Sequence, residues 1–219
     1  MRRLTGAVFM SLDGVMQAPG GPDEDPTSGF RYGGWAYPFF GEMGPFEDVI
    51  MGEYDLLLGR RTYDIFAAYW PYNQDQPIGE KFQRIDKYVL THSDEELGWK
   101  NSRKLSGDTA ATVAGLKQSP GRGLLIQGSG TLYPPLLSAR LIDRLVIMTF
   151  PVVLGAGKRI FDGSEQAGSL ELVDHFVSDK GVIIATYRPA GDVSVGSFET
   201  KPPSEAELER REKWVPEEG

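Results

Sequence analysis

Cysteine is absent from the sequence, and histidine occurs only twice, at His92 and His175. Without cysteine the chain cannot form disulfides, iron–sulfur clusters, cysteine-ligated zinc sites or a catalytic thiolate, and it is compatible with a reducing compartment. The two histidines lie far apart in the sequence, so we expect no metal site. No apolar run approaches the roughly 18 residues that a membrane span requires, and no signal peptide is indicated. We therefore expect no membrane partner and a cytoplasmic location.

Acidic residues outnumber basic ones, with 31 Asp and Glu against 23 Lys and Arg, which gives a net charge of −8. A negative field of this size repels nucleic acids, so none is expected as a partner, and an anionic ligand would need a local basic site. The 219 residues suffice for one domain with a sizeable core. The composition changes after Pro189. We expect one domain over residues 1–189 and a charged, partly helical extension over residues 190–219.

Short apolar runs alternate with helix-like segments, which predicts an α/β fold with both faces of a sheet covered. Strands are expected at residues 4–10, 55–59, 87–91, 124–127, 145–150, 170–177 and 182–187, the last two forming a hairpin. Helices are expected at residues 42–53, 62–69, 108–117 and 204–214, and a short one should begin near Thr131. Asp108 and Ser204 are suitable N-caps for two of these helices. The long irregular stretch at residues 17–40 is of a kind that often serves function.

Polar or glycine-rich sequence follows several of these strands, and ligands of open α/β sheets gather at the carboxyl ends of strands. The turn Gly59-Arg60-Arg61-Thr62 opens a predicted helix. Glycine permits a tight turn, a helix start offers free N–H groups, and arginine can bind a phosphate through two hydrogen bonds. A capped helix with solvated arginines explains the same residues, so both interpretations stay open.

A second glycine turn, Gly128-Ser129-Gly130-Thr131, follows a buried strand and would let the backbone approach a pyrophosphate closely. It lacks the third glycine of the dinucleotide fingerprint, because Tyr133 stands at that position. A glycine turn without any ligand is an equally good interpretation.

Asp13 follows the first predicted strand, and Asp-Gly is a common turn pair that needs no function. As a functional residue, Asp13 could hydrogen-bond an amide or amidine edge of a heterocycle or relay a proton to it. Trp35, Tyr37, Phe39 and Phe40 of the long irregular stretch could stack on such a ring or belong to the core.

Six segments taken in order resemble the dihydrofolate reductase superfamily over residues 2–188, in particular the branch of the bacterial riboflavin-biosynthesis reductase domain and its stand-alone relatives. The segments are SLDG at 11–14, GGW at 33–35, LLLGRRTYD at 56–64, KYVLTHS at 87–93, LLIQGSGTL at 124–132 and LIDRLVIMTFPVVLGAGKRIF at 141–161. The resemblance implies a three-layer α/β/α sandwich with a mixed, mostly parallel sheet and a C-terminal antiparallel hairpin. It also implies a possible homodimer.

The same resemblance implies an NADPH-dependent reductase that transfers hydride to a small heterocyclic, pteridine- or ribosylaminopyrimidine-like substrate, similar to 5-amino-6-(5-phosphoribosylamino)uracil reductase. Asp13 would be the catalytic residue, with Trp35, Leu154 and Gly155 on the substrate. The residues implied for NADPH are Gly59, Arg60, Arg61 and Thr62 at the adenosine-side phosphates, Thr91, His92 and Ser93 beside the adenosine, Gly128, Ser129, Gly130, Thr131 and Leu132 at the pyrophosphate, and Val153. The arginine pair favours NADPH over NADH, because a 2′-phosphate needs a positive partner.

Some features depart from that family. The zinc deaminase that often accompanies the riboflavin-biosynthesis domain is not expected in a chain without cysteine. The acidic residue that folate-reducing members place on their first long helix has only loose counterparts in Glu42, Glu47 and Asp48. Two alternatives stay open: a non-catalytic nucleotide- or small-molecule-binding protein on the same fold, and a nucleotide-binding enzyme of the Rossmann type.

Overall fold

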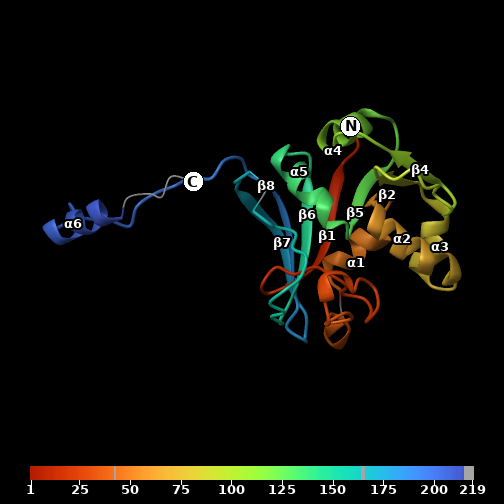
Figure 1. The fold of residues 1–219 in the computed structure, drawn as a ribbon, viewed down its shortest axis with the longest axis horizontal. Helices are drawn as coiled ribbons and strands as arrows, with labels where there is room; N and C mark the ends of the chain where they lie inside the picture. The colour runs from red at the N-terminus through yellow and green to blue at the C-terminus, as the bar shows by residue number, and fades with distance from the viewer. Residues whose placement is uncertain (42, 164–165, 215–219) are drawn as a thin grey trace.

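The computed structural model describes residues 1–41, 43–163 and 166–214, and its elements alternate as the sequence predicts (Figure 1). The strands are β1 (Leu4–Ser11), β2 (Tyr54–Gly59), β3 (Lys87–Leu90), β4 (Ser102–Leu105), β5 (Gly123–Gln127), β6 (Arg144–Phe150), β7 (Leu170–Val177) and β8 (Ile183–Pro189). The helices are α1 (Pro45–Met51), α2 (Arg60–Tyr69), α3 (Pro77–Arg84), α4 (Thr109–Gln118), α5 (Tyr133–Ser138) and α6 (Glu205–Lys213). Short 3-10 turns occur at Thr27–Gly29, Tyr37–Phe39, Trp70–Tyr72 and Gly130–Leu132.

All eight strands form one sheet in the order β4-β3-β2-β5-β1-β6-β8-β7. Strands β1 to β6 pair in parallel, whereas β8 is antiparallel to β6 and to β7. The predicted mixed, mostly parallel sheet with a C-terminal hairpin is therefore confirmed. Because the parallel strands run in one direction, their carboxyl ends meet at a single edge of the sheet.

Successive strand residues point to opposite faces, and each face has its own core. Ala7, Leu56 and Leu125 belong to a cluster that includes side chains of α1, α2, α3 and the long loop. Leu57 and Leu124 point the other way and pack with side chains of α4 and α5. This pattern explains why the central strands are apolar throughout: both of their faces are buried.

Several boundaries differ from the prediction for local reasons. The helix predicted over residues 42–53 is the shorter α1, because Gly44 precedes it at φ 46° and Pro45 takes its first position. Glu42 lies outside the described residues, as do residues 215–219 of the predicted extension. The predicted caps are confirmed: the Asp108 side chain accepts from Ala111 N at 2.8 Å and that of Ser204 from Glu207 N at 3.3 Å.

Two elements were missed by the sequence analysis. The helix α3 is short and contains a glycine, and Phe82 is its only fully buried large apolar residue. The strand β4 is an edge strand whose central residues, Arg103 and Lys104, are exposed and charged. Neither segment carries the apolar periodicity on which a sequence-based prediction depends. No helix in the described ranges is long and apolar enough to cross a membrane.

A buried ion pair fixes the amino ends of β1 and β2 relative to each other across β5. Arg2 Nη2 lies 2.5 Å from Asp55 Oδ2, and the two side chains are 1% and 8% exposed. The Arg2 guanidinium also stacks over the Tyr88 ring at 5.0 Å. Removing one member of such a pair leaves the other charge buried without compensation.

We expect Asp55→Asn to lower the free energy of unfolding by about 3–5 kcal/mol, because the Arg2 charge stays buried. The measurement is urea denaturation followed by circular dichroism. Asp86→Asn is the matched control, since Asp86 pairs with the largely exposed Arg103 and should cost less than about 1 kcal/mol. Equal losses in the two variants would contradict the structural role of the buried pair.

Candidate functional site

The predicted site residues come from turns that stand in a row along the carboxyl edge of the sheet. Residues 91–93 follow β3, residues 59–62 join the end of β2 to the start of α2, and residues 128–132 follow β5. Residues 11–13 end β1, and residues 153–155 follow β6. The strand order β3-β2-β5-β1-β6 makes these turns successive neighbours, although the sequence separates them widely.

The turns after β2 and β5 are tied together by two reciprocal hydrogen bonds. Gly59 N–H donates to Ser129 Oγ at 2.9 Å, and Ser129 N–H donates to Thr62 Oγ1 at 2.9 Å. Gly128 has a φ of 72°, and a Cβ atom at this position would lie 3.1 Å from Thr62 Cγ2. Glycine is therefore favoured at this position both by backbone conformation and by the close approach of Thr62.

The amino end of α2 lies beside this pair of turns. Gly59 occupies its N-cap position, and no side-chain hydrogen bond caps the helix there. The N–H groups of a first helical turn have no partner within the helix, and the helix dipole adds partial positive charge. Uncapped N–H groups together with the Gly128 turn suit the phosphate oxygens of a nucleotide.

The two arginines of this turn face different loops. Arg60 donates to Asp64 Oδ1 at 2.8 Å and to Glu95 Oε2 at 2.6 Å, so it reaches toward the loop that follows β3. Arg61 donates to Thr27 Oγ1 at 3.3 Å and lies 3.6 Å from Asp25 Oδ2 in the long loop. Their expected cooperation on one phosphate stays a prediction.

The loop after β3 is held by its own hydroxyl groups. Ser93 N–H donates to the buried Thr91 Oγ1 at 3.0 Å, and Glu95 N–H donates to Ser93 Oγ at 3.2 Å. His92, between them, is exposed. The loop thus carries Glu95 to the Arg60 side chain, and the predicted adenosine-side residues lie next to one another.

Asp13 connects the end of β1 to the segment after β6. Its Oδ1 accepts from Ser11 Oγ at 2.7 Å and from Leu154 N at 3.0 Å, while Oδ2 accepts from Gly155 N at 2.7 Å. These hydrogen bonds, that of the Ser11 hydroxyl foremost, lower the pKa of Asp13 to about 2. The carboxylate is therefore ionised at neutral pH and can accept protons in hydrogen bonds but not donate one.

Arg159 completes this connection and was not singled out by the sequence analysis. Its Nε donates to the Asp13 carbonyl at 3.0 Å, and its Nη2 donates to the Gly155 carbonyl at 2.6 Å. The same Nη2 lies 3.5 Å from Asp13 Oδ2. Val153, the preceding residue of this loop, is mostly exposed. Asp13 and Arg159 together fix the path of residues 153–155.

The long loop is fastened to the same segment through Gln17, which the sequence analysis also missed. The Gln17 side chain accepts from Lys158 N at 3.1 Å and donates to the carbonyls of Asp25 at 2.9 Å and Thr27 at 3.0 Å. The Lys158 ammonium also contacts the Asp25 carboxylate. Burial works to raise the pKa of Asp25, but the hydrogen bonds from Lys158 and Thr27 outweigh it and lower that pKa.

Trp35 lies in the core and not on an open surface. Its side chain is 7% exposed, its Nε1 donates to the Gln17 carbonyl at 2.7 Å, and its ring meets Phe150 edge-on at 5.2 Å. Trp35 therefore stabilises the long loop against β6, and its expected contact with substrate stays a prediction. Tyr37, by contrast, is largely exposed. No group of three or more metal-ligating side chains occurs in the described part of the chain.

Comparisons with known proteins identify the family and the fold of the chain. A family model described as the RibD C-terminal domain matches residues 2–184. Protein YyaP of Bacillus subtilis (strain 168), described as uncharacterized, is 24% identical over 194 residues, or 85% of this chain and 94% of YyaP. A structure ascribed to a riboflavin biosynthesis protein from Shewanella sp. PV-4 has a TM-score of 0.62 and 23% identity, covering 86% of this chain and 99% of that one.

Dihydrofolate reductase from Enterococcus faecalis, in a complex with NADP(H), has a TM-score of 0.53 and 16% identity, covering 85% of this chain and 96% of that one. The predicted dihydrofolate-reductase-like fold and the resemblance to the riboflavin-biosynthesis reductase branch are both confirmed.

We expect Thr62→Val to lower the free energy of unfolding by about 1–3 kcal/mol, because Ser129 N–H loses its acceptor in a partly buried place. Thr62→Ser keeps the hydroxyl and should recover most of the loss. Thr131→Val, at an exposed position of the same turn, is the control. Urea denaturation measures all three variants, and equal effects of Thr62→Val and Thr131→Val would contradict the proposed tie.

Proposed function

Because the chain belongs to the RibD C-terminal domain family, we propose that it is an NADPH-dependent reductase of a small nitrogen-containing heterocycle. The family match and the likeness to dihydrofolate reductase support an oxidoreductase. The observation that carries the finer proposal is the pair of interlocked turns, residues 59–62 and 128–132, beside the uncapped start of α2. Glycine backbone and free N–H groups are what dinucleotide phosphates require.

The choice of NADPH over NADH rests on Arg60. A 2′-phosphate needs a positive partner near the adenosine, and Arg60 reaches the loop that contains Thr91 and Ser93. Glu95 and Asp64 hold the guanidinium at this position, and both carboxylates are largely exposed to solvent. A phosphate dianion can therefore displace Glu95 at small cost, because exposed ion pairs are weak.

Strand order supports the direction in which the dinucleotide would lie. A ligand that extends from the Gly59 turn across the Gly128 turn next reaches the end of β1, since β5 lies between β2 and β1. Residues 11–13 and 153–155 line that end. When bound, NADPH supplies a hydride from its nicotinamide ring. The protein would supply orientation and exclusion of water, the latter through the long loop fastened by Gln17 and Lys158.

We assign Asp13 a positioning role. Reduction of a C=N bond adds a hydride to carbon and a proton to nitrogen, and at neutral pH the Asp13 carboxylate carries no proton to give. Solvent would then supply the proton, while Asp13 holds the N–H groups of Leu154 and Gly155 beside the end of β1. The proposed substrate class, a pteridine- or ribosylaminopyrimidine-like ring, is the one that the resemblance to the family implies.

Fluorescence titration of the purified protein with NADPH and with NADH tests the cofactor assignment. We expect a clear preference for NADPH, and Arg60→Ala should weaken NADPH binding about tenfold or more, since a charge-assisted hydrogen bond contributes about 1.5–3 kcal/mol. NADH binding should change less than about twofold. Arg84→Ala, which removes an exposed arginine paired with Glu80, is the matched control.

Equal weakening of both nucleotides by Arg60→Ala would overturn the 2′-phosphate assignment. Retained NADPH binding without oxidation of NADPH by pterins, flavin precursors or quinones would favour a binding protein over an enzyme.

We expect Asp13→Asn to lower turnover about tenfold or more while leaving the Kd for NADPH within about twofold, because the loop at residues 153–155 loses its fixed path. The lowered pKa of Asp13 means that its stabilising effect is present above the ordinary carboxyl pKa and lost as pH falls toward about 2. The Tm difference between wild type and Asp13→Asn should therefore shrink below about pH 4. Asp23→Asn, at an exposed acid, is the control. Unchanged turnover would exclude the role.

A further inference from the structure

Residues 190–192 continue from β8 and are held to the domain, since Ala190 N–H donates to the Ser169 carbonyl at 2.8 Å and Arg140 binds Asp192. The C-terminal arm, residues 193–214, then extends away from the sheet (Figure 1). Several of its apolar side chains are largely exposed, Val195 to 90% and Trp214 to 72%. Phe198 is exposed as well. The arm ends in the nine-residue helix α6. Isolated helices shorter than about 12–15 residues are marginal in water, so α6 needs a surface to pack on.

The helix α6 presents one unpaired acidic face. Glu205, Glu209 and Glu212 are spaced four and three residues apart and share a side of the helix with Leu208, which is 47% exposed. Glu207 differs, because Arg210 and Arg211 both bind it. In the described part of the chain the other three glutamates of this helix form no ion pair. The surface that receives α6 should therefore be basic, with some apolar contact for Leu208.

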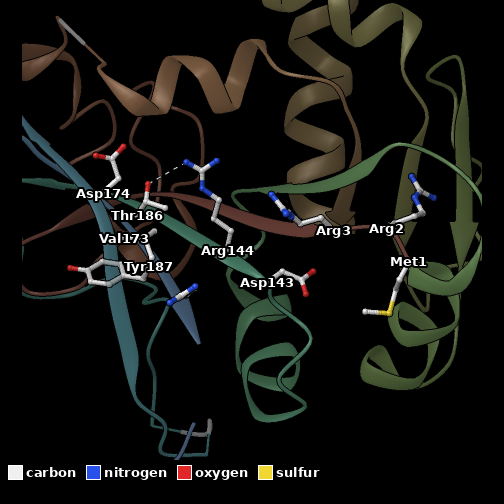
Figure 2. A pocket seen from close by; sticks show the side chains of 10 residues that line it. Met1, Arg2, Arg3, Asp143, Arg144, Val173, Asp174, Thr186 and Tyr187 are labelled. Atoms are coloured by element: carbon white, nitrogen blue, oxygen red, sulfur yellow. Dashed lines mark hydrogen bonds between the residues drawn. The ribbon is translucent and has the colours of Figure 1, made fainter. Parts of the chain in front are cut away.

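Figure 2 shows a hollow of about 500 Å³ that has basic and apolar lining residues. It lies at the amino edge of the parallel strands, opposite the candidate site. Its basic lining includes Arg3 before β1 and Arg144 at the start of β6, which are near one another because Thr5 pairs with Arg144 in the sheet. Within the described residues neither arginine has an acidic partner, and Arg144 donates only to Thr186 Oγ1, at 3.5 Å. Val173 adds an exposed apolar side chain.

The acidic residues of the hollow do not neutralise these arginines. Asp143 is bound by Lys117 at 2.7 Å, and Arg188 is occupied by Glu171 at 2.7 Å. Asp174 stays exposed on β7. Of the side chains that line the hollow, Arg3 and Arg144 thus face one unpaired carboxylate, that of Asp174, so positive charge remains for a further anionic group, in a chain whose net charge is −8.

We propose that this hollow receives α6 of a second copy of the same chain, so that two copies exchange their C-terminal arms. Glutamates of α6 meet Arg3 and Arg144, and Leu208 packs on Val173. The arm leaves the domain after Asp192, a few residues beyond Arg188, which itself lines the hollow, so a two-fold axis at this corner brings each arm to the other copy's hollow. Residues 193–204, when extended, span up to about 40 Å, which is ample reach.

The absence of cysteine allows a direct test by disulfide cross-linking of the full-length chain. Val173→Cys and Leu208→Cys are made in separate proteins, one carrying an affinity tag, and are mixed under mild oxidation. We expect a mixed disulfide dimer, and little dimer from either protein alone. Tyr72→Cys, exposed on the α2–α3 side of the molecule, replaces Val173→Cys as the control and should give at least tenfold less of the mixed dimer.

Charge variants identify the contact. Glu209→Arg in the Leu208→Cys protein should slow cross-linking at least tenfold, and it cannot unfold the domain because it lies in the arm. Adding Arg144→Glu to the Val173→Cys protein should restore the rate with Glu209→Arg. A disulfide formed only within one chain of the Val173→Cys, Leu208→Cys double variant would overturn the exchange in favour of an arm that folds back. The proposed docking site would be wrong if the Val173→Cys and Leu208→Cys proteins gave no more mixed disulfide dimer than the Tyr72→Cys control. It would also be wrong if the charge variants left the cross-linking rate unchanged.

Discussion

The hydrogen bonds that join Gly59, Ser129 and Thr62 are the contact on which the candidate site depends. They exist because β5, which comes after both β1 and β2 in the sequence, lies between these two strands in the sheet. Burial drives that placement: Leu124, Leu125 and Ile126 are covered on both faces, and only a central position in the sheet buries all of them. The glycine turn after β5 is thereby placed beside the amino end of α2.

The sequence predicts most strands and helices of this fold. The central strands are continuously apolar, and the helix caps involve residues that are close together in the sequence. Asp108 and Ser204 cap their helices through side-chain contacts three residues away, which a sequence pattern can reveal. No apolar pattern marks the strand β4, because edge strands tolerate charged residues. None marks the helix α3 either, because Phe82 is its only fully buried large apolar residue. In both elements the fold is imposed by neighbours that are distant in the sequence.

The candidate site likewise contains residues that a local sequence motif marks and residues that only long-range contacts bring into place. Turn glycines and the arginines that follow them form local motifs, so the sequence could identify residues 59–62 and 128–132. Gln17, Lys158 and Arg159 act through contacts with segments far away in the chain, and no local pattern marks them. Asp13 is an intermediate case. Its position after a strand was apparent, and the hydroxyl of the nearby Ser11 contributes most to its lowered pKa. The N–H groups of Leu154 and Gly155 lower that pKa further, and the parallel pairing of β1 with β6 brings them near.

Electrostatics distinguishes the two edges of the sheet. At the carboxyl edge Arg60 and Arg61 are already held by carboxylates, so an anionic cofactor would replace a weak, exposed ion pair. At the amino edge Arg3 and Arg144 have no such partner in the described residues, and the acidic face of α6 has none either. Two copies of a chain with a net charge of −8 repel each other, so their association requires local charges of opposite sign. An arm that carries glutamates to unpaired arginines would provide those charges without occupying the edge where a nucleotide would bind.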